Sequence, residues 1–274
     1  AFFAGINANK FSLTLNLRNQ SGTTILDELI RNTPVLIEDC ASRYGITYDA
    51  LKEINPGLIM ASVSGFGKDG PYKDYQSSDL IAMGMSGMQY QTGETFRPPT
   101  RFGYSIGSYF SGSALAAAIM IALFYRETTG KGQHIDVSKQ EALAAVLEQT
   151  LESFSFKLGI RERVGGGARK IGAFHVKYHY KTKDGMVNSL VANSQQFGRL
   201  MTLLGKQELK DNPKYKPLFS PLEHFAARHS PPFKEEFDHL IEEWTKTKDT
   251  MEVFLAFEEN SINCCPVFDM QGIF

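Results

Sequence analysis

The chain has 274 residues, of which 42% are hydrophobic and 22% charged, a composition typical of a globular protein with room for one large or two ordinary domains. The formal net charge of −1 gives no electrostatic reason to expect a nucleic acid or an anionic membrane as a partner. The three cysteines, Cys40, Cys264 and Cys265, match no metal-binding spacing and no disulfide framework, so no metal is expected and a reducing cytoplasm is favoured.

Strands and helices alternate in the predicted first part of the chain. The helix at 22–33 is expected to be capped by Thr23 or Thr24. A β-α-β-α-β order predicts a parallel, Rossmann-like sheet with ligands beyond the carboxyl ends of its strands, where SGFGKDGPY begins. In chain order, the predicted elements are strand 11–17, helix 22–33, strand 34–39, helix 47–56 and strand 58–67.

The next elements are a long apolar helix at 113–129, a turn and strand at 130–138 and a helix at 139–154. The longest apolar run, residues 114–125, is too short to cross a bilayer and predicts a buried helix. No signal peptide is visible, which also favours a cytoplasmic protein. The Gly-punctuated loop RFGYSIGS opens into the apolar helix and places Ser108 at its mouth.

The composition changes after the helix at 139–154. We predict a large Rossmann-like domain at 1–160, a Gly- and Arg-rich linker at 161–172 and a small α+β domain at 173–274. Within the small domain, we expect a hairpin at 174–193 that turns at Lys183-Asp184-Gly185. Amphipathic helices at 195–205, 232–247 and 250–261 and a last strand at 263–270 complete it.

Several segments together carry a resemblance to a known family. In chain order, they include NANKFSLTLNL, INPGLIMASVSGFGKDGPY, SSDLIAMGMSGMQYQTGE, the RFG loop with YFSG, RETTGKGQHIDVS, TKDGMV and NCCPVFDM. By these segments, the chain resembles the class III CoA-transferases, which include formyl-CoA transferase, carnitine CoA-transferase and the α-methylacyl-CoA racemases. The resemblance implies a Rossmann-like large domain, a smaller domain and an interlocked dimer. It also implies a family chain that is longer at both ends, with a first β-α unit before Ala1.

For function, the resemblance implies transfer of CoA from an acyl-CoA to a free carboxylate. CoA is then a substrate, and no cofactor is permanently bound. The family's catalytic aspartate attacks the thioester and falls on Ser108 in this chain. The only acidic residues from Thr92 to Gly132 are Glu94 and Glu127. A hydroxyl is a weak nucleophile unless a base is held against it, so Ser108 interrupts the transfer mechanism.

Two roles stay open for Ser108: a base-activated nucleophile, or a cap of its helix. The racemase branch has a His-Asp motif that reads Ser78-Asp79 here, so that its base is also absent. Asp79, Tyr104 and Tyr109 are the candidate substrate-pocket residues, with aromatic core packing as the alternative for the two tyrosines.

The resemblance also implies where CoA binds. The candidate positions are Asn9, Lys10 and the loop Ser64, Gly65, Phe66 and Gly67. Arg43 is the candidate substitute for an arginine in a family loop that is shorter here. The run Gly165, Gly166 and Gly167 is a candidate lid over the partner subunit's site, with a flexible linker as the alternative.

These observations lead to three hypotheses. The first is a non-catalytic subunit of a heteromeric transferase, interlocked with a homologous subunit that carries the aspartate; the transferases that act on benzylsuccinate with succinyl-CoA are the example. The second is an independently active CoA-thioester enzyme that uses Ser108 or Asp79. The third is a CoA-binding protein with no reaction.

Overall fold

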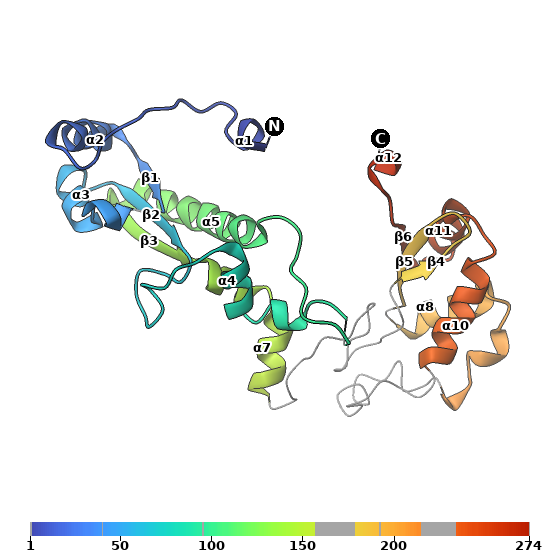
Figure 1. Ribbon diagram of the computed structural model, residues 1–274. Coiled ribbons are helices and arrows are strands. Elements are labelled where there is room, and N and C mark those ends of the chain that lie inside the picture. Colours follow the sequence, from blue (N-terminus) through green and yellow to red (C-terminus); the bar gives the residue numbers. More distant parts are fainter. Residues whose placement is uncertain are drawn as a thin grey trace. The chain divides into compact units, whose positions relative to one another are not determined.

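The computed structural model describes residues 2–39, 41–94, 96–156, 179–191, 193–214 and 234–273 (Figure 1). The chain forms two compact units. The first contains Ala1–Met88 and Gly103–Leu147, and the second contains Gln89–Phe102 and Glu148–Phe274. The predicted linker at 161–172, with its three consecutive glycines, lies outside the described residues. The division into domains at that linker therefore stays a prediction.

The first unit is built on a parallel sheet of three strands in the order β1-β2-β3. Ile59 of β2 pairs with Val35 of β1 on one side and with Gln133 of β3 on the other. The predicted strands at 34–39, 58–67 and 130–138 are confirmed. The strands are β1 (Val35–Glu38), β2 (Ile59–Ser64) and β3 (Gln133–Ser138).

Helices cover both faces of this sheet. Because neighbouring residues of a strand point to opposite faces, Met60 lies on one face of β2, and Ile59 and Ala61 lie on the other. Met60 joins a buried cluster with Ile30 and Leu51. The long helix α5 packs against β2, β3 and α6. The helices of this unit are α1 (Phe2–Ile6), α2 (Gln20–Asn32), η1 (Ala41–Tyr44), α3 (Tyr48–Ile54), α4 (Asp79–Met85), α5 (Ile106–Thr129) and α6 (Lys139–Ala145).

Two predictions near the start of the chain are wrong. Residues 11–17 alternate in polarity but form no strand, because no strand in the described ranges pairs with them and a lone strand leaves its peptide groups without partners. The cap of α2 is Asn19, whose side chain accepts from the Gly22 amide at 2.9 Å, rather than Thr23 or Thr24. Both threonines lie inside the helix, where their hydroxyls donate to the Gln20 carbonyl.

The long apolar helix differs from its prediction in extent and in burial. It begins at Ile106 rather than at 113, and by length and composition alone it could cross a bilayer. One side packs in the first unit through Leu115 and Ala122, which are buried. The other side leaves Met120 and Phe124 exposed, so the prediction of a buried helix holds for one side only.

The predicted helix at 139–154 is two helices, α6 and α7 (Glu148–Ser155). The break at Val146 and Leu147 falls where the chain leaves the first unit for the second. The hydrophobic pattern continues through the break, so it does not predict that the chain passes from one unit to the other there.

The second unit contains an antiparallel sheet in the order β4-β5-β6. The predicted hairpin is confirmed where it is described, and the Thr182 amide closes its turn on the Gly185 carbonyl at 3.0 Å. Tyr180, Phe237 and Phe257 are buried in the core of this unit. Its elements are η2 (Gln89–Gln91), α7, β4 (His179–Lys181), β5 (Met186–Leu190), α8 (Ser194–Leu203), η3 (Gln207–Leu209), α10 (Lys234–Thr245), α11 (Thr250–Glu259), β6 (Asn263–Pro266) and α12 (Met270–Ile273).

The hairpin turn caps a helix that its own residues leave uncapped. Asp249 holds the N-cap position of α11 without a side-chain bond. Instead, the Asp184 carboxylate accepts from the Thr250 hydroxyl and the Thr250 amide, both at 2.7 Å. These bonds hold the pKa of Asp184 below its ordinary value, with the larger contribution from the Thr250 hydroxyl and the next from the Thr250 amide.

A depressed pKa in the folded state predicts a pH-dependent contribution to stability. The contribution of Asp184 is present above the ordinary pKa, 3.8, and is lost as the pH falls through the lower folded value. We expect Asp184→Asn to lower the melting temperature at pH 7 and the difference from the unaltered chain to shrink below about pH 4. Thermal melts across this range check it, with Asp211→Asn, at an exposed position, as control. A difference that stays constant with pH would contradict this role.

Candidate functional site

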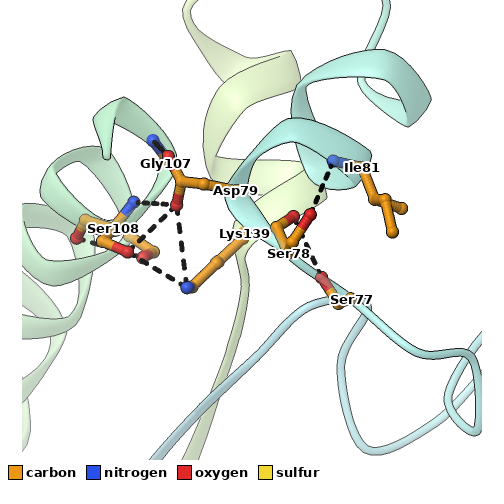
Figure 2. Close-up of polar contacts among 8 residues, drawn as sticks. Ser77, Ser78, Asp79, Ile81, Gly107, Ser108 and Lys139 are labelled. Carbon is orange, nitrogen blue, oxygen red and sulfur yellow. Dashed lines mark hydrogen bonds and ion pairs between the residues drawn. The ribbon is translucent and has the colours of Figure 1, made fainter. Parts of the chain in front are cut away.

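The candidate site lies where β2 and β3 end. Ser64 is the last residue of β2, and Ser138 is the last residue of β3. Three side chains meet beyond these ends, each from the first turn of a different helix: Asp79 of α4, Ser108 of α5 and Lys139 of α6 (Figure 2). We call these three residues the serine–lysine–aspartate cluster. Its position agrees with the rule that ligands of open parallel sheets bind at the carboxyl ends of the strands.

Asp79 caps helix α5 from outside that helix. Ser105 holds the N-cap position of α5 but makes no side-chain bond there. The two carboxylate oxygens of Asp79 instead accept from the amide of Gly107 at 2.8 Å and the amide of Ser108 at 3.0 Å. A carboxylate suits this place because the first amides of a helix have no partners within it and carry partial positive charge.

A glycine allows this close approach. A Cβ at position 107 would lie 3.1 Å from Asp79 Oδ1 and 3.3 Å from the Leu143 side chain. A contact of this kind is tight, so a larger residue would push the carboxylate away from the start of α5. The Gly-punctuated loop of the sequence therefore has a structural reason at Gly107.

Ser108 lies between the other two members of the cluster. Its hydroxyl donates to Asp79 Oδ1 at 3.0 Å and accepts from Lys139 Nζ, also at 3.0 Å (Figure 2). Lys139 Nζ is 3.7 Å from Asp79 Oδ1. The hypothesis that Ser108 caps its helix is wrong, because α5 begins two residues earlier than this serine and Asp79 bonds its first amides.

No histidine in the described ranges bonds Ser108. His134 contacts the Ser62 hydroxyl, His179 contacts Asn188, and His239 pairs with Glu243. A serine nucleophile is usually activated by an imidazole, and none of these three histidines supplies one to Ser108. The Ser108 hydroxyl donates to Asp79, whose carboxylate already accepts hydrogen bonds from two backbone amides.

The loop predicted to hold CoA lies next to the cluster. The Gln140 amide, one residue after Lys139, donates to the Gly65 carbonyl at 3.1 Å. Gly65 also packs so closely against Ser77 that a Cβ at this position would collide with it. Within the loop, the Gly67 amide donates to the Ser64 hydroxyl at 2.8 Å, and Phe66 is buried. The structure thus places Gly65 against Ser77 and Gln140, which lie two residues before Asp79 and one residue after Lys139.

The other candidate CoA residues lie elsewhere on the first unit. Lys10 folds back on α1, where its ammonium donates to the Ile6 carbonyl and lies 3.4 Å from Asn7 Oδ1. Asn9 has a left-handed backbone, with φ 59°. Arg43 is exposed on η1, which follows β1. Within the described ranges, no hydrogen bond or ion pair joins these three residues to the loop 64–67, so their role in CoA binding stays a prediction.

The two candidate pocket tyrosines line an open cavity of about 600 Å³. Tyr104 is 87% exposed and Tyr109 is 54% exposed, so the alternative that they pack in the core is wrong. Asp79 is not part of the cavity wall. The cavity is lined by Phe2, Gly103, Tyr104, Ile106, Tyr109, Phe110 and Ser113.

Sequence reasoning missed Lys139. The residue directly follows the predicted strand at 130–138, and the rule for parallel sheets places such residues near the site.

Cys264 is unsuited to nucleophilic chemistry, because burial, with smaller contributions from Cys265 and Glu258, raises the pKa of its thiol to about 12.

The sheet, its covering helices and the cluster at the strand ends define an α/β protein with a site at the carboxyl edge of a parallel sheet. Residues 1–274 match CoA-transferase family III, and the chain belongs to this family. It is 29% identical to the succinate–glutarate CoA-transferase of Agrobacterium fabrum over 100% of this chain and 66% of that protein. It is 32% identical to the succinyl-CoA–D-citramalate CoA-transferase of Chloroflexus aurantiacus over 90% of this chain and 60% of the relative.

A solved structure has the same fold. The crystal structure of a CAIB/BAIF family protein from Brucella suis matches with a TM-score of 0.76 at 29% identity, over 98% of this chain and 69% of that one. A further relative, at 28% identity over 97% of this chain and 64% of its own length, is the succinyl-CoA–L-malate CoA-transferase beta subunit of Chloroflexus aurantiacus. The chain thus spans about two thirds or less of the curated relatives named here.

Proposed function

We propose that the chain is a non-catalytic subunit of a heteromeric CoA-transferase of family III. The assembly moves CoA from an acyl-CoA, with succinyl-CoA as the first donor to test, to a carboxylic acid. Benzylsuccinate is the first acceptor to test. A homologous subunit supplies the aspartate that attacks the thioester, and the two subunits interlock. CoA enters and leaves as a substrate, and the cytoplasm is the proposed compartment.

One observation carries this proposal: the carboxylate at the cluster is already engaged. Asp79 accepts from two backbone amides and the Ser108 hydroxyl and lies beside Lys139. Attack on a thioester would take this carboxylate away from the start of α5. The residue aligned with the family's catalytic aspartate is Ser108, whose hydroxyl is a weak nucleophile. The cluster therefore offers no carboxylate free for the first covalent step.

Two further observations support a partner. The Chloroflexus relative that acts on L-malate is named as a beta subunit. Helix α5 also presents Met120, Ile121 and Phe124 to solvent in the single chain. An apolar face of this kind favours coverage by other protein, since burying apolar surface is favourable in water.

The alternative is an independently active enzyme that uses Ser108, and the contact with Lys139 favours it. A lysine can activate a serine by accepting its proton. Here, the Lys139 ammonium donates to the Ser108 oxygen at 3.0 Å, and the Ser108 proton points to Asp79. The residues needed for serine activation are thus present, but Lys139 donates a proton to Ser108 and does not accept one from it.

Ser108→Ala is expected to change CoA transfer by the assembled pair by less than about twofold, because the reacting carboxylate belongs to the partner. Alanine at the partner's loop aspartate is expected to lower transfer by about a thousandfold or more. The measurement is CoA transfer from succinyl-CoA to a panel of carboxylates, with this chain alone and with a homologous subunit.

Ser105→Ala serves as the matched control, because Ser105 lies at the same helix start without a side-chain cap bond. If the chain transfers CoA alone and Ser108→Ala abolishes the transfer, the subunit proposal is wrong and the alternative replaces it.

A further inference from the structure

The loop that follows β2 is held by carboxylates from the strands on both sides of β2. Glu38, the last residue of β1, pairs with Lys68, and Glu38 Oε1 lies 3.0 Å from Lys68 Nζ. Asp136 of β3 accepts from the Lys68 amide at 2.6 Å. Lys68 directly follows the loop 64–67, so its ammonium ties the end of this loop to β1 and its amide ties it to β3. We call Glu38, Lys68 and Asp136 the Lys68 clamp.

The ion pair of the clamp is largely shielded from water. The Glu38 side chain is 8% exposed, and the Lys68 side chain is 25% exposed. Separating the two charges is costly in such a place, because water solvates them poorly there. A lysine beside a predicted CoA loop is otherwise a candidate partner of a CoA phosphate. The Lys68 ammonium, however, is already engaged within the protein.

The loop between these anchors has one particular backbone conformation. Gly67 is left-handed, with φ 87°, and its amide donates to the Ser64 hydroxyl at 2.8 Å. The Gly65 carbonyl accepts from the Gln140 amide at 3.1 Å, so α6 holds the start of the loop. The Lys68 clamp holds its end. A loop that is fixed at both ends loses less conformational entropy when a ligand binds to it.

We propose that the Lys68 clamp positions the loop 64–67 for CoA. Glu38 and Asp136 hold the loop in the arrangement that binds CoA, and Lys68 acts through the loop rather than as a ligand of a CoA phosphate. The proposal rests on the proposed function, because it takes the loop 64–67 as part of the CoA site. It adds positioning roles for three residues that contact the loop or follow it in the chain.

The test is the affinity for CoA, measured by isothermal calorimetry on the complex with a homologous subunit, or on the chain alone if no complex forms. We expect Glu38→Gln to weaken CoA binding about tenfold, because a released loop that is in the binding arrangement for about a tenth of the time lowers the apparent affinity by that factor. Lys68→Met should have a similar effect. The double variant should bind no more weakly than either single variant, since both substitutions break the same ion pair. Lys68→Arg keeps the charge and should retain most of the affinity.

The same titration separates the clamp from a direct contact between Lys68 and a phosphate. If Lys68 bound a CoA phosphate, Glu38→Gln would release the ammonium from a competing carboxylate, and CoA would bind at least as tightly as before. Hydrogen exchange of the amides at 65–68 gives a readout without CoA, and we expect it to become faster in Glu38→Gln.

Lys131→Met is the matched control. Lys131 is an exposed lysine just before β3, whereas the clamp lies near the other end of the strands. The control should leave the affinity for CoA and the exchange at 65–68 unchanged within about twofold. Circular dichroism establishes that the variants are folded, and Lys68→Met replaces Glu38→Gln if the latter is not.

Either of two results would overturn the proposal. One is a folded Glu38→Gln variant that binds CoA as tightly as the unaltered protein. The other is an unaltered protein that binds no CoA. Failure of the transferase proposal looks different, because CoA would then bind and the clamp variants would weaken it, while the assembly transfers no CoA.

Discussion

Asp79→Ala is expected to lower the free energy of unfolding by about 2–3 kcal/mol. The substitution removes the acceptor of two amides at the start of α5 and leaves Lys139 without the carboxylate beside it. The side chain of Asp79 is only 20% exposed, so water replaces these bonds poorly. Because α5 is the longest helix described and packs on β2 and β3, loosening its first turn affects the first unit as a whole.

Urea unfolding of the variant and of the unaltered chain checks this value. Asp49→Ala is the control, because Asp49 also lies in the first turn of a helix but is exposed and pairs only with Lys52 in the contacts described. The control should have little effect. Equal effects of the two substitutions would mean that Asp79 is an ordinary surface carboxylate that is not held by the amides of α5.

Gly132→Ala is expected to destabilise the first unit by about 3 kcal/mol. A Cβ at this position would collide with the backbone of Leu58, with its carbonyl carbon at 2.5 Å and its nitrogen at 2.7 Å. Both atoms belong to the chain at the entry to β2, so no side-chain rotation can relieve the contact. The Gly132 amide also donates to the Pro56 carbonyl at 2.9 Å, and the Gln133 amide donates to the Leu58 carbonyl at 3.2 Å. The start of the pairing between β2 and β3 would have to open.

The control for this substitution is expected to change the free energy of unfolding in the opposite direction. A Cβ at Gly112 meets nothing within 4 Å, and the residue lies inside α5. Gly112→Ala should therefore stabilise the chain by about 0.5–1 kcal/mol, the difference in helix propensity between the two residues. Urea unfolding measures both. A fully stable Gly132→Ala would mean that β2 and β3 are not held at this distance.

The alternation of strands and helices in the first part of the chain was predictable from local pattern. Short apolar runs at Val35–Glu38 and Ile59–Ser64, separated by the helix Tyr48–Ile54, are enough to predict parallel strands. The same rule, that ligands bind at the carboxyl ends of such strands, predicts the edge of the sheet at which the candidate site lies. That Ser108 stands at the position of the family's catalytic aspartate stays a prediction, which rests on the family resemblance of the surrounding sequence.

Tertiary structure decided which partners the local elements find. Residues 11–17 have the alternation of a strand, but a strand also needs a neighbour to bond its peptide groups, and the local pattern does not report one. Likewise, Asp79 and Asp184 cap α5 and α11. These carboxylates lie 28 and 66 residues from the Gly107 and Thr250 amides that donate to them. Sequence rules look for a cap within the first turn, so a carboxylate brought in by the fold escapes them. For the same reason, the contact of Lys139 with Ser108, 31 residues apart, appears only when α5 and α6 begin at the same edge of the sheet.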